Sequence, residues 1–293
     1  MSLTNENRMS AISIVMTAYN AEETIAEAIE SILNQSFTDF EFIIVNDGST
    51  DSTRSIIGSY DDKRIRLIDN EHDYIQSLNT GLKASTGKYI ARMDADDISH
   101  IDRFKLQYSI MEESPEITVC CSWMFMFGEK APSKIFEQNI SGIIESPLVQ
   151  LFLDDFIINP TAMIRNSFVK EHNLLYENYM CAEDYKYWVD VAMFNGVFYV
   201  DSQPLVYKRV ADSQITIKYR DIQIETTSKI KKEIIHALCH ENKECPALMS
   251  LCNAYYELLD QKLISESGIV LTLYSLFMQN KDKLNLSKVK PVI

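Results

Sequence analysis

The sequence predicts an α/β protein with a doubly wound, mostly parallel sheet and helices on both faces. The first observation behind this prediction is that short apolar runs alternate with helical patterns over the first hundred residues, which is typical of right-handed strand-helix-strand crossovers. The second is composition: 46% of the 293 residues are hydrophobic and 24% are charged, enough for one large domain plus an appendage. Ligands of such sheets bind at the carboxyl ends of the strands. The chemistry is therefore expected in the residues that follow the strands.

Four strands are expected in the first hundred residues, and the first is expected to be buried and to end in a loop. Their ranges are 12–16, 40–45, 64–68 and 88–93. Helical patterns separate them, and the clearest is the apolar repeat of Ile25, Ile29, Ile32 and Leu33, which lie on one helical face. Alternation of this kind indicates a parallel sheet.

Past residue 97 the alternation loosens, and the pattern predicts an α+β region. Helices are expected at 103–111, 147–153 and 184–194, strands at 117–127 and 161–164, and a strand pair within 197–207. From about residue 220 the pattern is helical, with candidate helices at 222–239, 246–262 and 265–278. We therefore expect a sheet domain over residues 1–219 and a C-terminal helical region over 220–293.

Charge and missing motifs exclude several classes of function. With 42 acidic and 28 basic residues the chain carries a net charge of −14, which disfavours a nucleic-acid partner. None of the 8 glycines forms a GxG pair, so neither a dinucleotide fingerprint nor a P-loop is present. The HExxH and GxSxG motifs are also missing from the sequence. Carboxylates remain as the expected carriers of the chemistry.

The strongest chemical signal is Asp94-Ala95-Asp96-Asp97, directly after the fourth expected strand. Side chains alternate along an extended segment, so the carboxylates of Asp94 and Asp96 are expected to point the same way. Such a pair suits a hard divalent cation, Mg2+ or Mn2+. The alternative is a solvated acidic turn. Position favours the metal, because Asp47 ends the second strand at the same edge and converging carboxylates are costly without a cation.

Four blocks of sequence follow one another along the chain: IVMTAYN (14–20), VNDGSTD (45–51), GKYIARMDADD (87–97) and AEDY (182–185). Together and in this order they resemble the family 2 glycosyltransferases. The resemblance covers roughly residues 11–215 and implies an inverting, metal-dependent enzyme with the GT-A fold. It implies a catalytic domain over 1–219, with a nucleotide half at about 11–97 and an acceptor half at about 98–219.

The resemblance also implies roles for single residues. The nucleotide-binding residues are Thr17, Ala18, Tyr19, Asp47 and Asp94. Asp96 binds the metal that bridges the diphosphate, Asp47 reads the uracil ring, and Asp184 is the catalytic base. Three of these residues have an alternative role in local structure: Asp47 as a turn residue, Tyr19 as a core tyrosine and Asp184 as a helix N-cap. Trp188, one turn after Asp184, is expected either under the acceptor sugar or in the core.

One block departs from the family pattern. Many relatives have a Tyr-Arg-x-His block that supplies a histidine to the metal or diphosphate, and here Ala211 aligns with that histidine. Lys208 and Arg209 are the candidate diphosphate contacts in its place.

The location of the protein is predicted from two further features. The N-terminus has no basic run followed by an apolar segment, and the most apolar stretches are shorter than the roughly 20 residues of a spanning helix, so a cytoplasmic protein is expected. Four lysines (Lys281, Lys283, Lys288 and Lys290) lie beside the apolar 268–278, a combination that can hold a protein at the inner face of a membrane. A docked helix with a solvated basic tail is the alternative.

The leading hypothesis is a transferase that moves a hexose or N-acetylhexosamine from a nucleoside-diphosphate sugar, a UDP-sugar, to a glycan or lipid-linked acceptor in bacterial-type surface polysaccharide synthesis. A sugar-phosphate nucleotidyltransferase would need a Gly-rich loop near the N-terminus, which is missing from the sequence. The remaining alternative is a catalytically weak sugar-nucleotide-binding protein of the same fold, which the departure at Ala211 favours.

Overall fold

A computed structural model describes residues 10–128, 133–136, 140–210, 219–241, 271, 274–275 and 277–279. Contacts divide the chain into two compact units. The first comprises Met1–Gly142, Ile158–Tyr176 and Tyr199–Asp212, and the second comprises Ile143–Ile157, Glu177–Phe198 and Ser213–Ile293. The expected domain division between residues 219 and 220 remains a prediction.

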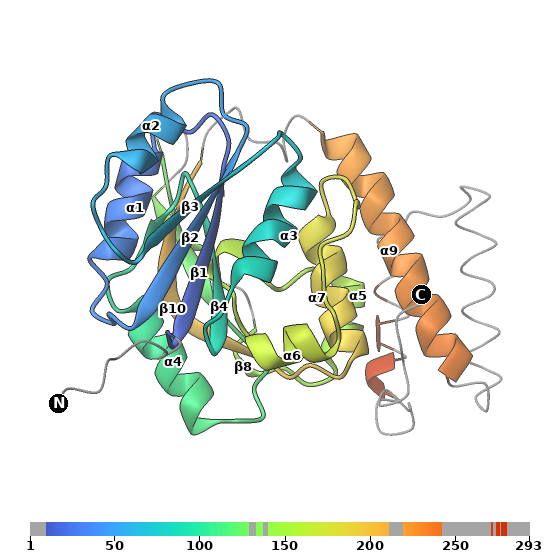
Figure 1. The fold of residues 1–293 in the computed structure, drawn as a ribbon. Coiled ribbons are helices and arrows are strands. Elements are labelled where there is room, and N and C mark those ends of the chain that lie inside the picture. The colour runs from blue at the N-terminus through green and yellow to red at the C-terminus, as the bar shows by residue number, and fades with distance from the viewer. Residues whose placement is uncertain are drawn as a thin grey trace. The chain divides into compact units, whose positions relative to one another are not determined.

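The first unit is built on a mixed sheet (Figure 1). Its strand order is β3-β2-β1-β4-β9-β6-β10-β5, with β7 beside β6. The strands are β1 (Ile12–Ala18), β2 (Phe40–Asp47), β3 (Ile65–Asn70), β4 (Tyr89–Asp94), β5 (Ile98–Ser99), β6 (Val119–Phe127), β7 (Lys134–Phe136), β8 (Gly142–Ile143), β9 (Met163–Arg165) and β10 (Phe198–Arg209). The pairs among β1 to β4 are parallel, whereas β9 pairs antiparallel with β4 and with β6. The predicted doubly wound sheet is confirmed, with an antiparallel half after β4.

Helices cover both faces of the parallel half. Those of the first unit are α1 (Ile25–Leu33), α2 (Thr53–Gly58), α3 (Tyr74–Ala84), α4 (Arg103–Glu113), the 3-10 turn η1 (Asn159–Thr161) and α6 (Asn166–Glu171). Figure 1 shows α1 and α3 on opposite sides of the sheet.

Strand β1 is covered on both faces, because all of its seven residues are buried. Ile14 and Met16 pack in one core cluster with Ile29 of α1. Val15 points to the other face, where a Cβ added to Gly81 of α3 would lie 2.3 Å from its Cγ1. Only glycine lets α3 approach the strand so closely.

The structure differs from the sequence-based prediction at two of the later strands. The strand pair expected within 197–207 is wrong, because residues 198–207 all lie in the single strand β10. A tight reversal needs a residue with positive φ, and none occurs among the described residues of this strand. The strand expected at 161–164 is shorter, since η1 takes up its first residue.

The second unit contains α5 (Pro147–Leu153), α7 (Glu183–Met193) and α9 (Arg220–Glu241). α5 and α7 match the predicted helices, and α9 confirms a helical region toward the C-terminus. The expected helix 246–262 and the four C-terminal lysines lie outside the described residues, as does most of 265–278. Within the part of the chain that is described, no helix has both the length and the apolar character to cross a membrane.

Candidate active site

The carboxyl ends of β1, β2 and β4 bring predicted residues to one edge of the sheet. Thr17 is the register partner of Asp94 on β4, and Ala18 is the partner of Asn46 on β2. Asp47 is the last residue of β2. The chain places β2 and β3 on one side of β1 and β4 on the other, so the strand order reverses at the β1–β4 pair. Open α/β sheets bind ligands at such a switch point.

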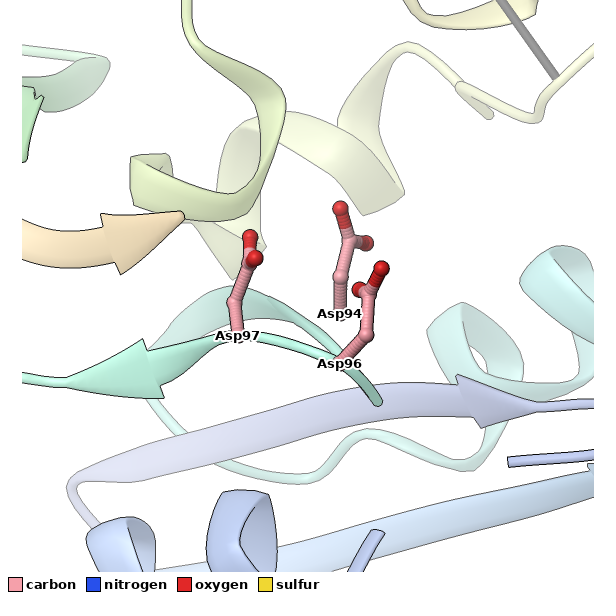
Figure 2. Close-up of side chains that lie close together, drawn as sticks. All are labelled: Asp94, Asp96 and Asp97. Carbon is pink, nitrogen blue, oxygen red and sulfur yellow. The ribbon is translucent and has the colours of Figure 1, made fainter. Parts of the chain in front are cut away.

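Three carboxylates converge directly after β4. Asp94 is the last residue of the strand, and Asp96 and Asp97 lie in the turn before β5. One carboxylate oxygen from each lies within 4.8 Å of the others. Figure 2 shows the three side chains on the same side of this turn. We call Asp94, Asp96 and Asp97 the acidic triplet.

The geometry of the triplet differs from the expected one. The segment is not extended beyond Asp94, and the N–H of Asp97 approaches the carbonyl of Asp94 at 3.5 Å, as in a turn. In an extended strand Asp97 would point away from Asp94 and Asp96. The turn instead adds Asp97 to the group, which the two-residue alternation could not predict.

The triplet is only partly neutralised by the chain. Arg92, whose side chain is 3% exposed, donates to the Asp94 carboxylate at 3.2 Å. Oδ1 of Asp97 accepts the backbone N–H of Arg209 at 3.0 Å. Oδ2 of Asp97 is buried and has no hydrogen-bond donor among the described residues. A buried carboxylate oxygen without a donor is costly unless a cation contacts it.

The pKa shifts of Asp97 and Asp96 also indicate that the negative charge of the triplet is only partly neutralised. Burial, and then the charge of Asp94, raise the pKa of Asp97 well above its usual range. Burial and Asp94 also raise the pKa of Asp96, although the nearby charges of Lys208 and Arg209 lower it in part. The donor set therefore fits a hard divalent cation, which prefers carboxylate oxygens.

The side chain of Arg209 stabilises the turn that carries the acidic triplet. Its Nε donates to the carbonyl of Asp96 at 3.1 Å, and its Nη2 donates to the carboxylate of Glu27 on α1. Its guanidinium also lies 4.8 Å from the ring centroid of Phe127. The diphosphate contacts expected for Lys208 and Arg209 remain predictions, and Ala211 lies outside the described residues.

Asp47 is a carboxylate whose partners are built into the fold. Its side chain is 2% exposed. Oδ1 accepts hydrogen bonds from the Ser77 hydroxyl at 2.7 Å and from the backbone N–H of Asp73 at 2.9 Å. Oδ2 lies 2.9 Å from Nδ1 of His72. Asp47 therefore does more than form the turn before Gly48.

Tyr19 lies at the surface beside this group. It is 45% exposed, so the alternative of a buried core tyrosine is wrong. Its ring stacks on the imidazole of His72, with centroids 3.9 Å apart and planes 16° apart. Sequence reasoning missed His72, Asp73 and Ser77. The signal that could have found them is their place after the third strand, at the same edge of the sheet as Asp47.

Asp184 lies in the first turn of α7, in the second unit. The N-cap of this helix is Ala182, so the N-cap alternative for Asp184 is wrong. Together with Asp154, Asp155 and Lys231, Asp184 lines a cavity of about 640 Å³ within this unit. Burial, and then the charge of Asp184, raise the pKa of Asp155 well above its usual range. The cavity offers a carboxylate that can accept a proton from a bound hydroxyl.

Other residues of α7 serve the core. Trp188 is 1% exposed and packs against Tyr187 with ring centroids 5.1 Å apart, so the core alternative for Trp188 is confirmed. Nζ of Lys186 lies 2.7 Å from both carboxylate oxygens of Asp190, and both side chains are buried.

Comparisons with known proteins agree with the ordered sequence blocks. Residues 13–172 match the family model described as Glycosyl transferase family 2. An uncharacterized glycosyltransferase of Haemophilus influenzae is 38% identical over 237 residues, which cover 76% of this chain and 73% of that protein. The UDP-Glc:alpha-D-GlcNAc-diphosphoundecaprenol beta-1,3-glucosyltransferase WfgD of Escherichia coli is 28% identical over 229 residues, covering 72% and 82%.

A solved structure shows the same fold. The crystal structure of S. aureus TarS 1-349 in complex with UDP-GlcNAc superposes with a TM-score of 0.65 and 19% identity, covering 78% of this chain and 66% of that one. The match to the family model covers more than half of the sequence and includes the strand-end blocks from which the site is built. The chain is therefore a glycosyltransferase with the GT-A fold and belongs to family 2, an inverting family.

Proposed function

We propose that this enzyme transfers a hexose or N-acetylhexosamine from a UDP-sugar to a glycan or lipid-linked glycan acceptor, in surface polysaccharide synthesis on the cytoplasmic side of a membrane. The catalytic domain is assigned to residues 1–219, and the C-terminal helical region, 220–293, is assigned a peripheral membrane contact. The E. coli relative is named for a UDP-glucose donor and a diphosphoundecaprenol-linked acceptor. The TarS structure holds UDP-GlcNAc.

One observation carries the proposal: the acidic triplet lies at the switch point of the sheet and includes a buried oxygen of Asp97 that has no donor in the part of the chain that the structure describes. Asp96, with its neighbours in the triplet, would hold Mg2+ or Mn2+. The cation, when bound, supplies positive charge to the diphosphate leaving group. Lys208 and Arg209 add positive charge on the same side, since both lower the pKa of Asp96.

The nucleoside is assigned to the neighbouring strand ends. Thr17 and Ala18 line the pocket from β1, and Asp94 lies against the ribose. Tyr19 offers an exposed aromatic face on which a base can stack. Asp47 accepts the imide N–H of uracil, a hydrogen that cytosine lacks, so a wrong base would leave polar groups unpaired.

Asp184 is assigned the role of general base. Its carboxylate takes the proton of the acceptor hydroxyl as that oxygen bonds to the anomeric carbon and the bond from that carbon to the diphosphate oxygen breaks on the opposite face. The sugar is transferred with inversion, and UDP leaves. The support in this structure is the position of Asp184 at a cavity with two further carboxyl groups, Asp154 and Asp155.

Two variants separate donor binding from transfer. Asp96→Ala should abolish the Mn2+-dependent part of UDP binding, measured by calorimetry with and without the metal, because it removes a cation ligand. Asp184→Asn keeps the shape of the side chain and removes its basicity. UDP release in the presence of acceptor should therefore fall by about 100-fold or more, with UDP affinity unchanged.

Glu183→Gln is the matched control for Asp184, because Glu183 lies in the same helical turn. It should leave transfer near the wild-type rate. UDP affinity that is equal for wild type and Asp96→Ala under both conditions would contradict the metal assignment. UDP binding without transfer in the wild type would favour the alternative, a sugar-nucleotide-binding protein.

A further inference from the structure

His72 lies between two groups assigned above to the nucleobase. Its imidazole stacks on the ring of Tyr19 at 3.9 Å between centroids. Its Nδ1 lies 2.9 Å from Oδ2 of Asp47 and 3.1 Å from the backbone carbonyl of Asp47. Both neighbours of Nδ1 are acceptors, so Nδ1 carries the hydrogen and donates it.

The Asp47 carboxylate has little remaining capacity to accept further hydrogen bonds. Oδ1 already accepts from Ser77 and from the backbone of Asp73, and the carboxylate is almost fully buried. Oδ2 is the oxygen that the imidazole occupies. A nucleobase that reaches Asp47 while stacked on Tyr19 would need the position that His72 now fills.

The imidazole also matches a base in its chemistry. It is a flat ring that stacks on an aromatic face and donates a ring N–H to a carboxylate. Uracil would use the same two interactions, with its N3–H as the donor. The two rings are alternatives for one place.

The imidazole can leave this place without rearrangement of the backbone. Its side chain is 56% exposed, and its described hydrogen bonds are those to Asp47. The adjoining backbone is held, because the N–H of Asp73 donates to Oδ1 of Asp47 at 2.9 Å. Rotation of the side chain alone would therefore open Asp47 and the face of Tyr19.

We infer that His72 is a built-in competitor of the nucleobase: the incoming uracil displaces the imidazole from Asp47 and Tyr19, and His72 thereby sets the affinity for the donor. This inference rests on the proposed function, since it takes Asp47 and Tyr19 as the base pocket. The apparent affinity of such a site is reduced by the fraction of molecules in which the pocket is open. Removal of the imidazole should increase the fraction of molecules with an open pocket, and therefore the apparent affinity for the donor.

Calorimetry on the full chain tests the inference with three ligand conditions: UMP without metal, UDP without metal and UDP with Mn2+. His72→Ala should bind UMP and UDP about three- to tenfold more tightly than the wild type, by a similar factor in all three conditions. The similar factor is expected because the competition concerns only the base. Glu71→Gln, an exposed neighbour, is the matched control and should bind as the wild type does.

The outcomes separate this inference from the proposed function. If His72→Ala binds more weakly, His72 supports the base instead of competing with it, and the inference is wrong. Unchanged affinity also overturns it. An increase seen only for UDP with Mn2+ would assign the effect to the diphosphate and overturn competition at the base. If neither wild type nor variant binds UMP or UDP, the proposed function itself fails, and the inference with it. Thermal melting of His72→Ala without ligand confirms that the variant is folded.

Discussion

The carboxyl ends of β2 and β4 carry the same chemical group with very different partners. Asp47, at the end of β2, is buried and accepts hydrogen bonds from a hydroxyl, a backbone N–H and an imidazole. Asp97, just after β4, is also buried, but only one of its oxygens has a donor among the described residues. Burial and the charges of its acidic neighbours raise the pKa of Asp97.

The difference shows how one sheet edge can build two kinds of binding group. A carboxylate with its donors in place stabilises the fold and offers a fixed acceptor. A carboxylate that lacks donors and lies among other acids destabilises the fold until a cation arrives. Substitution at these two positions should therefore change stability in opposite directions.

The largest effect is expected at Asp47. Asp47→Ala would leave the buried hydroxyl of Ser77 and the N–H of Asp73 without their acceptor, so the free energy of unfolding should fall by about 3 to 4 kcal/mol in urea denaturation. Asp47→Asn keeps one acceptor oxygen and should lose about half as much. A full loss for Asp47→Ala with no loss for the isosteric Asp47→Asn would show that volume, not hydrogen bonding, determines the effect.

Asp190 is a third buried carboxylate, and its positively charged partner is a side chain of the protein itself. Lys186 is bonded to it, yet burial raises the pKa of Asp190 from 3.8 to about 6. The folded state then binds a proton more tightly than the unfolded state, so the stability that this group contributes is present below about pH 4 and is lost as pH rises through about 6.

Asp190→Asn removes this titration. The free energy of unfolding of the wild type, measured relative to the variant, should fall by about 2 to 3 kcal/mol between pH 4 and pH 7. Parallel curves for the two proteins would show that the Lys186 ion pair fully compensates for burial.

The smallest effect, with the opposite sign, is expected at Asp97. Asp97→Asn keeps the oxygen that accepts the N–H of Arg209 and removes one of three neighbouring negative charges. At pH 8 without metal, the free energy of unfolding should rise by about 1 kcal/mol. Asp61→Asn, at an exposed position, is the control and should change it by less than about 0.5 kcal/mol. A destabilised Asp97→Asn protein would contradict the comparison drawn between β2 and β4.

Much of the parallel half could be predicted from sequence. Strands β1, β2 and β4 are short, mostly apolar runs, and β3 adds the charged Arg66 and Asp69 to its apolar residues. Helical patterns lie between the strands, and both signals are local. The acidic residues at the carboxyl end of β4, and Asp47 at the end of β2, could be located for the same reason. The antiparallel half could not, because β9 has three residues and pairs with β4 across a wide separation in sequence, as in Tyr89 with Arg165.

Contacts between residues far apart in the sequence also limit what could be predicted of the site. His72 follows no periodic pattern, and its importance depends on contacts with Tyr19 and Asp47 that come from other strand ends. The turn that brings Asp97 to Asp94 and Asp96 replaces the extended geometry that simple alternation predicts. Such contacts depend on tertiary structure, which a single sequence does not display.

The late position of Arg209 in the sequence affects the order in which the site forms during synthesis. Arg209 is 182 positions from Glu27 along the chain, yet it joins α1 to the turn that carries the acidic triplet. Its backbone N–H is also the donor to Asp97. A nascent chain that has emerged only as far as β6 contains every residue of the triplet but lacks the contacts that Arg209 makes with their turn. Since domains fold as units during synthesis, the motif is translated early and the cation site is completed late, when β10 joins the sheet.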